Sequence, residues 1–387
     1  MASKVGVALL GAGGFGRTHL DRLARLAEEG STELIGVCDP AGPSDKVPEG
    51  TAMYSDLAEL LAETTPEVVI VSTPIHTHVP LAIQAMEAGA DVYLEKPPAA
   101  SLAAFSDLLA VQRRTGRVCQ VGFQSLGSAG LGRIPELIAD GVIGDVVRYQ
   151  ARGLWLRRRY YYQRSAWAGK RRDGEVIIAD GVTTNPLSHS VATALRLAGL
   201  EQLGPIDSIT TELYRAHDIE CDDTSFIEVT PRDGTGVAPV RAALTVCAPE
   251  QRDALVDVVG TEGMITFHYT NDVIDIVGAD GSMRTETAGR TDLFENLLAH
   301  RDDPGVELLS PLERTSSFTG VLQAVLDAPA PTRLSEGSGI TWVDEGDDAH
   351  PVLADIPHWV DAAVADGGYA AAGAPWASSE AVTVHQI

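Results

Sequence analysis

The 387-residue chain has few cysteines, few lysines and no long apolar run. Its four cysteines lie far apart, without the C-x-x-C spacing of a zinc site: Cys38, Cys119, Cys221 and Cys247. The lack of a cysteine framework fits a reducing compartment, so we expect a cytoplasmic protein and no metal site. No stretch of about 18 apolar residues occurs, so no transmembrane helix is expected. The apolar run Val5–Leu10 is better explained as a first strand than as a signal peptide.

Positive charge is also scarce. The chain has 29 lysine and arginine residues, of which four are lysines, against 54 acidic residues, and its formal net charge is -25. A chain this acidic repels phosphate backbones and anionic membrane surfaces, so neither nucleic acid nor a membrane is an expected partner. The apolar fraction of 44% is ordinary for a globular protein, and the length suits two domains. We therefore expect a folded, two-domain protein that binds a small molecule.

The first 125 residues alternate between strand-like and helix-like segments. The expected strands are largely apolar: Val5–Leu10, Glu33–Cys38, Val68–Ser72, Asp91–Leu94 and Val118–Phe123. The expected helices lie between them: Phe15–Glu29, Asp56–Glu63, Pro80–Ala88 and Leu102–Arg114. Buried strands that alternate with helices are typical of a parallel sheet covered on both faces, and right-handed crossovers make it a doubly wound Rossmann domain.

After Gln124 the pattern predicts a second domain, 126–387. Its expected helices are Ile134–Ala139, Leu187–Leu197, Leu293–His300 and Pro311–Ala328. Its expected strands are Val146–Leu156, Ser208–Tyr214, Ser225–Val229, Val240–Cys247, Leu255–Val259, Met264–Tyr269 and Val273–Val277. Alternation between polar and apolar residues indicates a large open, mainly antiparallel sheet. The predicted fold class is α/β, with a Rossmann domain over 1–125, a C-terminal α/β domain and an irregular tail from about residue 329.

The clearest motif lies where the first expected strand meets the first expected helix. Gly11, Gly13, Gly14, Phe15 and Gly16 belong to a G-x-G-x-x-G sequence, which in this context is typical of dinucleotide binding. The first glycine allows a tight turn, the second lets the pyrophosphate approach the backbone, and the last permits close packing of helix and strand. The N-terminus of the helix then offers N–H groups to the phosphates.

Asp39 ends the second expected strand, 23 residues after Gly16. Its carboxylate can accept hydrogen bonds from the adenosine ribose hydroxyls and would repel a 2′-phosphate, which favours NAD over NADP. The residues that follow Asp39 include no arginine that could hold such a phosphate. The alternative is that Asp39 is only a turn residue before Pro40.

Lys96 follows the expected strand Asp91–Leu94, between Glu95 and Pro97. Ligands of parallel sheets bind at the carboxyl ends of the strands, and a lysine there can hold a substrate hydroxyl and stabilise the alkoxide that forms as hydride leaves. Pro97 allows a cis peptide bond, although X–Pro bonds are usually trans. The alternative is a solvated lysine at the end of a strand.

Asn185 and His189 lie four residues apart and are expected to share one face of a helix. Asn185 followed by Pro186 also predicts an N-cap with proline at the first helical position. A histidine one turn into the helix can accept a hydroxyl proton near neutral pH. The alternative is a capped helix with a partly buried histidine, and the residues alone favour neither interpretation.

The segment 157–172 is basic and aromatic within an acidic chain. Such interleaving can bind single-stranded nucleic acid, but the net charge of the whole chain argues against that. Aromatic faces suit sugar rings, and arginines bind hydroxyls or a carboxylate. Tyr162, Arg164 and Trp167 are therefore candidates for substrate binding. The alternative is a surface loop held by ion pairs and aromatic packing.

Together these motifs resemble the Gfo/Idh/MocA family, which includes glucose–fructose oxidoreductase and inositol dehydrogenase. Residues 72–78, Ser-Thr-Pro-Ile-His-Thr-His, resemble the family's TPNxxH stretch. Residues 81–89 and the Glu-Lys-Pro sequence at 95–97 follow at the family's spacing, and residues 121–124 resemble the strand that closes its Rossmann domain. The resemblance covers nearly the whole chain, and it implies a homo-oligomer, a dimer or a tetramer, often assembled through the open sheet.

The resemblance also implies roles for single residues. Lys96 would bind the reacting hydroxyl and the nicotinamide ribose, and His189, in the helix that carries the family's D-x-x-x-H motif, would accept the proton. Further positions correspond to residues that line the cofactor: Thr73, Pro74, His78, Glu95 and Gln124. Asn185 replaces the aspartate of D-x-x-x-H, which keeps a hydrogen-bonding side chain but loses the charge that would raise the pKa of the histidine. Asp180 lies near in sequence and is a candidate to supply that charge.

Three functions follow as hypotheses. The first is an NAD-dependent oxidoreductase that oxidises or reduces a secondary alcohol or keto position of a sugar, polyol or sugar-derived substrate. The second is an NAD-dependent glycosidase that oxidises its substrate only transiently. The third is a sensor of sugars or dinucleotides without catalytic activity, which the presence of both Lys96 and His189 disfavours.

Overall fold

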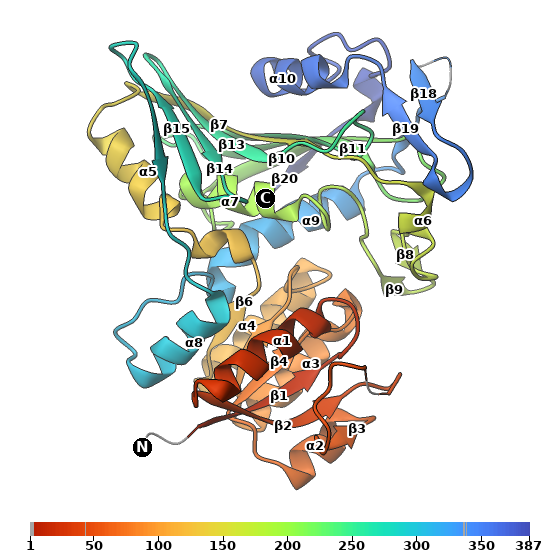
Figure 1. Ribbon diagram of the computed structural model, residues 1–387. Helices are drawn as coiled ribbons and strands as arrows, with labels where there is room; N and C mark the ends of the chain where they lie inside the picture. The colour runs from red at the N-terminus through yellow and green to blue at the C-terminus, as the bar shows by residue number, and fades with distance from the viewer. Residues whose placement is uncertain (1–3, 43, 336, 338) are drawn as a thin grey trace. The chain divides into compact units, whose positions relative to one another are not determined.

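A computed structural model describes residues 4–42, 44–335, 337 and 339–387, and the chain divides into two compact units. The first unit combines the chain up to Phe123 with Leu293–Glu313, and the second combines Gln124–Asp292 with Arg314–Ile387. Figure 1 shows the first unit in red, orange and cyan. The boundary expected near residue 125 assigned Leu293–Glu313 to the C-terminal domain, whereas this segment packs within the first unit.

The first unit is built on a six-stranded parallel sheet with the spatial order β3-β2-β1-β4-β5-β6. The strands are β1 (Val5–Leu10), β2 (Thr32–Cys38), β3 (Met53–Tyr54), β4 (Val68–Val71), β5 (Asp91–Leu94) and β6 (Cys119–Val121). Its helices are α1 (Gly16–Glu28), α2 (Leu57–Glu63), α3 (Ile75–Glu87), α4 (Leu102–Thr115) and α8 (Leu293–Asp302). Strand order reverses at β1, as in a doubly wound fold, and the predicted Rossmann domain is confirmed.

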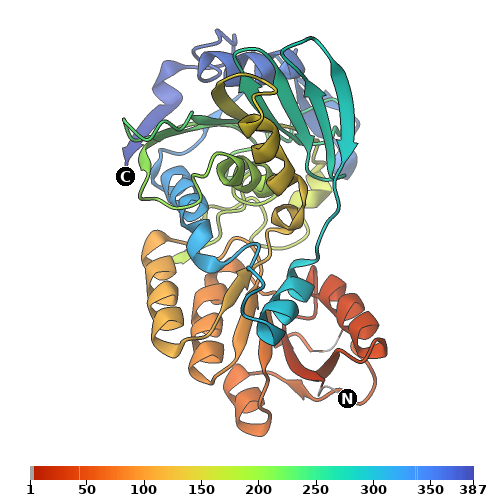
Figure 2. The ribbon, with the colours of Figure 1, turned by 90° about the vertical axis from the view of Figure 1, so that its left-hand side faces the viewer.

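Helices α1 and α8 share one hydrophobic core with the sheet. Leu20, Leu23 and Leu26 of α1 recur every three residues and are buried in the same cluster as Phe294 and Leu297 of α8. Figure 2 shows α3 and α4 on the opposite side of this sheet. Because α8 buries its apolar residues here, it belongs to the first unit, although the sequence alone predicted a helix of the second domain.

Helix α3 begins five residues before the predicted start at Pro80 and so includes His78. A proline was expected to begin the helix, because it cannot donate a backbone hydrogen bond. The turn before Pro80 is also helical, because its side chains are held in place. Thr77 Oγ1 donates to the carbonyl oxygen of Pro74 at 2.7 Å, and His78 is buried. His78 thereby lies in the first turn of the helix, next to the end of β4.

The second unit is built on a ten-stranded sheet with the order β16-β15-β14-β13-β7-β12-β11-β10-β17, and β20 also pairs with β10. The strands are β7 (Val146–Leu154), β10 (Ile206–Arg215), β11 (Thr224–Pro231), β12 (Val240–Thr245), β13 (Leu255–Gly260), β14 (Met264–His268), β15 (Val273–Val277), β16 (Met283–Thr287), β17 (Thr332–Arg333) and β20 (Val382–Gln386). Only the β7–β12 and β10–β17 pairs are parallel among the described strands of this sheet. The predicted open, mainly antiparallel sheet is confirmed.

Helices cover both faces of this large sheet. The helices of the unit are α5 (Gly130–Ala139), α6 (Arg159–Tyr162), α7 (Ser188–Leu197), α9 (Ser316–Asp327) and α10 (Ile356–Asp366). Short elements complete it: η1 (Gln124–Gly127), η4 (Gly346–Asp348), η5 (Ser379–Ala381), the pair β8 (Arg172–Asp173) and β9 (Val176–Ile177), and the pair β18 (Ile340–Val343) and β19 (His350–Leu353). The short helix η2 (Leu312–Thr315) spans the point at which the chain passes from the first unit to the second. Figure 1 shows α7 and α9 on one face and α10 on the other.

The described residues after 329 form helix α10 and strands β17, β18, β19 and β20, so the prediction of an irregular segment from about residue 329 is wrong. Tyr369 and Trp376 bury their rings against Tyr214 of β10, with centroids 6.2 and 5.1 Å from the Tyr214 ring. These aromatic residues are isolated among alanine, glycine and aspartate, so no periodic pattern reveals them. Throughout the described part of the chain, the helices are too short or too polar to span a bilayer.

Candidate functional site

Most of the predicted cofactor residues follow the carboxyl ends of neighbouring strands in the first unit. The glycine loop follows β1, Asp39 follows β2, Thr73 follows β4, and Lys96 follows β5. Because these strands are parallel and adjacent, the four segments lie along one edge of the sheet. This is the edge at which doubly wound sheets bind their ligands.

The glycines of the loop have different physical reasons to be glycine. A Cβ atom at Gly11, where φ is +84°, would lie 2.3 Å from the carbonyl oxygen of Ser72, and one at Gly16 would lie 2.0 Å from that of Gly11. Cβ atoms at Gly13 and Gly14 would have no atom of the described residues within 4 Å. Gly11 and Gly16 are therefore required by packing, whereas Gly13 leaves an open space beside the backbone.

The N-terminus of α1 is open toward this space. In the described chain, no side chain accepts a capping hydrogen bond from the first turn of α1, and that turn has no acidic residue. Phe15, at the N-cap position, is 48% exposed and its ring packs edge-on against His19 at 5.4 Å. The first-turn N–H groups of Gly16, Arg17 and Thr18 donate to backbone carbonyl oxygens of the glycine loop and Phe15. The positive end of the helix dipole still favours a phosphate at this position.

Asp39 is tied to the glycine loop. One of its carboxylate oxygens accepts the N–H of Ala12 at 2.8 Å, and the other accepts the N–H of Ala41 at 2.9 Å. The structure also brings Arg17 of α1 to the loop that follows β2, where its guanidinium pairs with Asp45. Nothing in the sequence indicated that Arg17 would lie here. Its hydrogen bond to the Asp45 carboxylate lowers the pKa of Asp45.

His78 holds together the segments that follow β4 and β5. Its Nε2 lies 2.7 Å from the carbonyl oxygen of Thr73, and its Nδ1 lies 2.8 Å from that of Pro97. Burial lowers the pKa of His78. Thr77 Oγ1 also reaches Thr73 Oγ1 at 2.6 Å. Thr77 and His78 in the first turn of α3 thus hold Thr73 and Pro74, two of the predicted cofactor-lining residues, in place.

Glu95 lies in a buried chain of polar groups that leads to Lys96. Arg22 donates to His19 Nδ1 at 2.7 Å, His19 Nε2 lies 2.9 Å from Glu95, and Glu95 accepts the backbone N–H of Lys96 at 3.2 Å. A guanidinium can only donate, so His19 Nδ1 must be the acceptor and the ring proton is on Nε2, directed at Glu95. A Cβ on Gly122 would lie only 2.9 Å from the Glu95 carboxylate, which leaves that carboxylate little room. The Lys96–Pro97 peptide bond is cis.

Helix α7 of the second unit carries His189 in its first turn, but Asn185 does not lie on the same helix. Leu187 occupies the N-cap position and the helix begins at Ser188, so the predicted N-cap at Asn185 is wrong. Threonine side chains compete for the preceding turn, where Thr184 Oγ1 donates to the carbonyl oxygen of Ala179. His189 Nδ1 lies 3.5 Å from Ser125 Oγ, which also accepts the hydroxyl of Thr193 at 2.9 Å.

Asp180 is the charged centre of this turn. Asn185 Nδ2 donates to one of its carboxylate oxygens at 2.6 Å, and Arg164 contacts both oxygens at 2.8 and 2.6 Å. The N–H of Gly169 also donates to Asp180 at 2.7 Å. A buried carboxylate therefore does lie beside Asn185, as its place in the sequence suggested, but Arg164 neutralises it.

The predicted substrate-side residues separate into two groups. Arg164 stacks over Tyr161 at 3.9 Å and over Trp167 at 4.8 Å, measured from its Cζ to the ring centroids. Tyr162 instead packs against His217, with centroids 4.8 Å apart, and burial raises its pKa well above the ordinary value. Tyr162 lines a cavity of about 600 Å³ together with Arg159, Gln163, Ala216, His217, Asp218, Ile219, Arg333 and Trp342. Gln124 begins η1 in the second unit, where its carbonyl oxygen accepts a hydrogen bond from Arg290.

Comparisons with known proteins agree with the architecture of the first unit. Residues 5–123 match the model of the GFO_IDH_MocA family, described as an oxidoreductase family with an NAD-binding Rossmann fold. Inositol 2-dehydrogenase of Salmonella typhimurium is 30% identical over 158 residues, which are 39% of this chain and 46% of that protein. The 2,7-anhydro-N-acetylneuraminate hydratase of Mediterraneibacter gnavus is 31% identical over 153 residues, 39% of this chain and 40% of that protein.

A solved structure extends the likeness in fold to the second unit. The WlbA dehydrogenase of Bordetella pertussis, in complex with NADH and UDP-GlcNAcA, aligns with a TM-score of 0.66 over 83% of this chain and 95% of that chain. At 21% sequence identity this similarity shows the fold alone. The chain spans less than half the length of the curated relatives it matches. Sequence similarity therefore identifies the NAD-binding Rossmann fold of residues 5–123, and for the second unit the comparison shows the fold alone.

Proposed function

We propose that this chain is an NAD-dependent oxidoreductase of the Gfo/Idh/MocA family, because residues 5–123 match that family's model of an NAD-binding Rossmann fold. Its substrate is a sugar, a polyol or a sugar-derived compound, and the reacting group is a secondary alcohol or the corresponding ketone. The observation that carries the proposal is the edge where the open glycine loop, Asp39 and Lys96 follow adjacent parallel strands. The glycine loop fits a dinucleotide, since Gly13 leaves space for the pyrophosphate beside an uncapped helix N-terminus.

Lys96 and His189 divide the chemistry in this proposal. NAD, when bound, supplies the acceptor for the hydride. Lys96 donates a hydrogen bond to the substrate oxygen and stabilises the negative charge that develops on it. His189 accepts the hydroxyl proton on Nε2, while its Nδ1–H is directed at Ser125 Oγ. Glu95 positions the backbone of Lys96, and His19 holds Glu95.

We propose that the second unit supplies the groups that bind the substrate. Asn185 and Arg164 share the Asp180 carboxylate, and Trp167 lies against the Arg164 guanidinium. Tyr162 faces a separate cavity, so its role as a substrate contact requires that the substrate extend there. For the cofactor, Asp39 favours NAD over NADP, because its carboxylate would repel a 2′-phosphate. Arg17, the cation that α1 brings to the loop after β2, is paired with Asp45.

The test is an absorbance assay for NADH with the full-length protein, NAD and a panel of inositols, aldoses, sugar acids and glycosides. Turnover with one group of substrates is expected, and Lys96→Ala and His189→Ala should each reduce kcat by about 10²–10⁴-fold. Lys4→Ala and His358→Ala are matched controls, because both residues are exposed and lie outside the proposed site. Full activity of Lys96→Ala would contradict the proposed chemistry.

One relative favours keeping a second candidate function. The Mediterraneibacter gnavus protein is named a hydratase, which implies a reaction without net oxidation. A glycosidase that uses NAD transiently would likewise produce no net NADH. Release of sugar or aglycone from a glycoside, without a change in NADH absorbance, would identify this reaction and exclude net dehydrogenation. Neither turnover nor bond cleavage, despite NAD binding, would favour a sensor.

We also propose that the protein is a cytoplasmic homo-oligomer, a dimer or a tetramer. All four cysteines are free and buried, which agrees with a reducing compartment. Light scattering of the purified protein measures the oligomeric state, and a monomer at micromolar concentration would contradict this proposal.

A further inference from the structure

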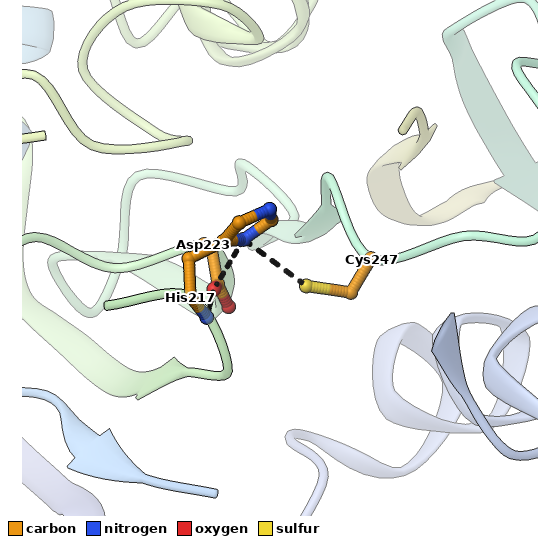
Figure 3. Close-up of side chains that lie close together, drawn as sticks. All are labelled: His217, Asp223 and Cys247. Atoms are coloured by element: carbon orange, nitrogen blue, oxygen red, sulfur yellow. Dashed lines mark hydrogen bonds and ion pairs between the residues drawn. The ribbon is translucent and has the colours of Figure 1, made fainter. Parts of the chain in front are cut away.

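Three buried side chains of different chemistry, none of which has a role in the proposed function, meet at one end of the large sheet. His217 lies in the turn after β10, Asp223 immediately precedes β11, and Cys247 follows β12. Their exposed fractions are 2%, 0% and 0%. One nitrogen, one oxygen and one sulfur atom from these residues all lie within 4.8 Å of one another. Figure 3 shows the three side chains directed toward one another.

The contacts around His217 leave one ring nitrogen for this cluster. Its Nε2 lies 2.9 Å from the carbonyl oxygen of Arg157, an acceptor that requires a proton on Nε2. Its Nδ1 lies 3.0 Å from an Asp223 carboxylate oxygen and 4.0 Å from Cys247 Sγ. A histidine that binds a metal commonly donates its second ring N–H to a backbone carbonyl in this way. Nδ1 therefore either carries a second proton or offers its lone pair to a cation.

In the part of the chain that the structure describes, the Asp223 carboxylate is held by hydrogen bonds at only one of its two oxygens. One oxygen, Oδ2, accepts the backbone N–H groups of Ala216 and His217 at 2.7 Å each, which orients the carboxylate. The other, Oδ1, is buried and has no hydrogen-bond partner within the described ranges of the chain. A buried carboxylate oxygen without a partner is costly, and binding to a cation would satisfy it.

We propose that His217, Asp223 and Cys247 bind one divalent cation of the zinc type. Imidazole nitrogen, carboxylate oxygen and thiolate sulfur are the ligands that zinc prefers, at about 2.0–2.3 Å, and small inward shifts of the side chains bring the three atoms to those distances. A water molecule supplies a fourth ligand, since His217 also lines the 600 Å³ cavity described above. The Cys247 thiol proton, and the Nδ1 proton if His217 carries one, leave to solvent as the cation binds.

Such a cation would link parts of the second unit that are distant in sequence. It connects the turn between β10 and β11 to Cys247, two residues beyond the end of β12. Through the His217–Arg157 hydrogen bond, it is also connected to the start of the segment 157–172. None of the ligands has the short regular spacing of a zinc motif, which explains why the sequence gives no signal for this site.

The test uses full-length protein that has been stripped with a chelator and then titrated with Zn²⁺ or Co²⁺. Elemental analysis should find one ion per chain, and Co²⁺ should produce a thiolate-to-metal charge-transfer band. Cys247→Ser should abolish the band and weaken Zn²⁺ binding by more than the roughly 10–100-fold that loss of an outer-shell partner costs. Cys221→Ser, another buried thiol of the same unit, should leave both unchanged.

Thermal unfolding provides a second measurement. Zn²⁺ should raise the midpoint of wild type and of Cys221→Ser but not that of Cys247→Ser, because only a cation bound to the folded state stabilises it. No cobalt band in wild type, or full Zn²⁺ affinity in Cys247→Ser, would overturn the proposal. The cluster would then be an imidazolium–carboxylate pair beside a protonated thiol. If Cys247→Ser does not fold, the wild-type cobalt spectrum decides by itself.

Discussion

Two glycines of the same loop should respond in opposite ways to replacement by alanine. At Gly13 an added Cβ would have no described atom within 4 Å, whereas at Gly16 it would lie 2.0 Å from the carbonyl oxygen of Gly11. A separation of 2.0 Å from a backbone atom cannot be relieved by rotating a side chain. Gly16→Ala should therefore destabilise the fold by about 1–3 kcal/mol or more, the usual cost of overpacking.

Gly13→Ala should leave stability nearly unchanged, within about 0.5 kcal/mol, because the site is open and its φ is not positive. The same open space is where we place the pyrophosphate, so the new methyl group should oppose NAD binding. A steric cost of about 1–3 kcal/mol corresponds to roughly 5–150-fold weaker binding. The pair of variants therefore separates the packing role of one glycine from the binding role of the other.

Chemical denaturation measures the first quantity, and titration calorimetry with NAD measures the second. Wild-type affinity in Gly13→Ala would refute the reasoning, because the pyrophosphate would then not approach this backbone. Stability equal to wild type in Gly16→Ala would show that helix α1 can move away from β1 at little cost. Gly132→Ala is a control, since its Cβ also meets open space but it lies on α5, in the second unit.

Three further predictions concern buried or paired charges. Asp39→Asn should weaken NAD binding and reduce the preference for NAD over NADP, measured as the ratio of the two dissociation constants. An unchanged ratio would contradict the proposed role of the carboxylate. His19→Phe keeps a ring but removes the Nε2 donor to Glu95, and should cost about 1.5–3 kcal/mol of unfolding free energy, the value of a hydrogen bond to a charged group; a loss below that range would show that solvent replaces His19. Burial raises the pKa of Asp222 to about 6, so the folded state holds this proton to higher pH than the unfolded state, and its contribution to stability falls by on the order of 2–3 kcal/mol as the pH rises from about 4 to 6. Asp222→Asn should remove that part of the pH dependence, and identical pH profiles of unfolding for variant and wild type would contradict the shift.

Local patterns were sufficient to predict the Rossmann domain and its loop. Strand β4 is a run of buried apolar residues, β1 and β5 are largely so, and the glycine motif lies between β1 and α1. Buried parallel strands produce continuous apolar sequences, so their order along the chain is readable without a structure. The position of Lys96, two residues beyond the end of β5, could be read from the sequence in the same way.

Features that depend on distant contacts were not predicted. Helix α8 has an ordinary helical sequence, and only the packing of Phe294 and Leu297 shows that it belongs to the first unit. The ordered C-terminal tail depends on a few aromatic rings that pack against Tyr214. A sequence pattern reports which face of a segment is apolar, but it does not report which surface that face covers.

For the candidate site, the sequence by itself was enough to select the residues that we propose to carry the chemistry: the glycine loop, Asp39, Lys96, Asn185 and His189. Only the tertiary structure decided what holds them. The His19–Glu95 pair joins residues 76 positions apart, and Asp180 receives Asn185 and Arg164 together. These hydrogen bonds form because folding removes water from the side chains, so that buried polar groups must bond to one another. The partners are not regularly spaced in the sequence, so no sequence pattern reveals them.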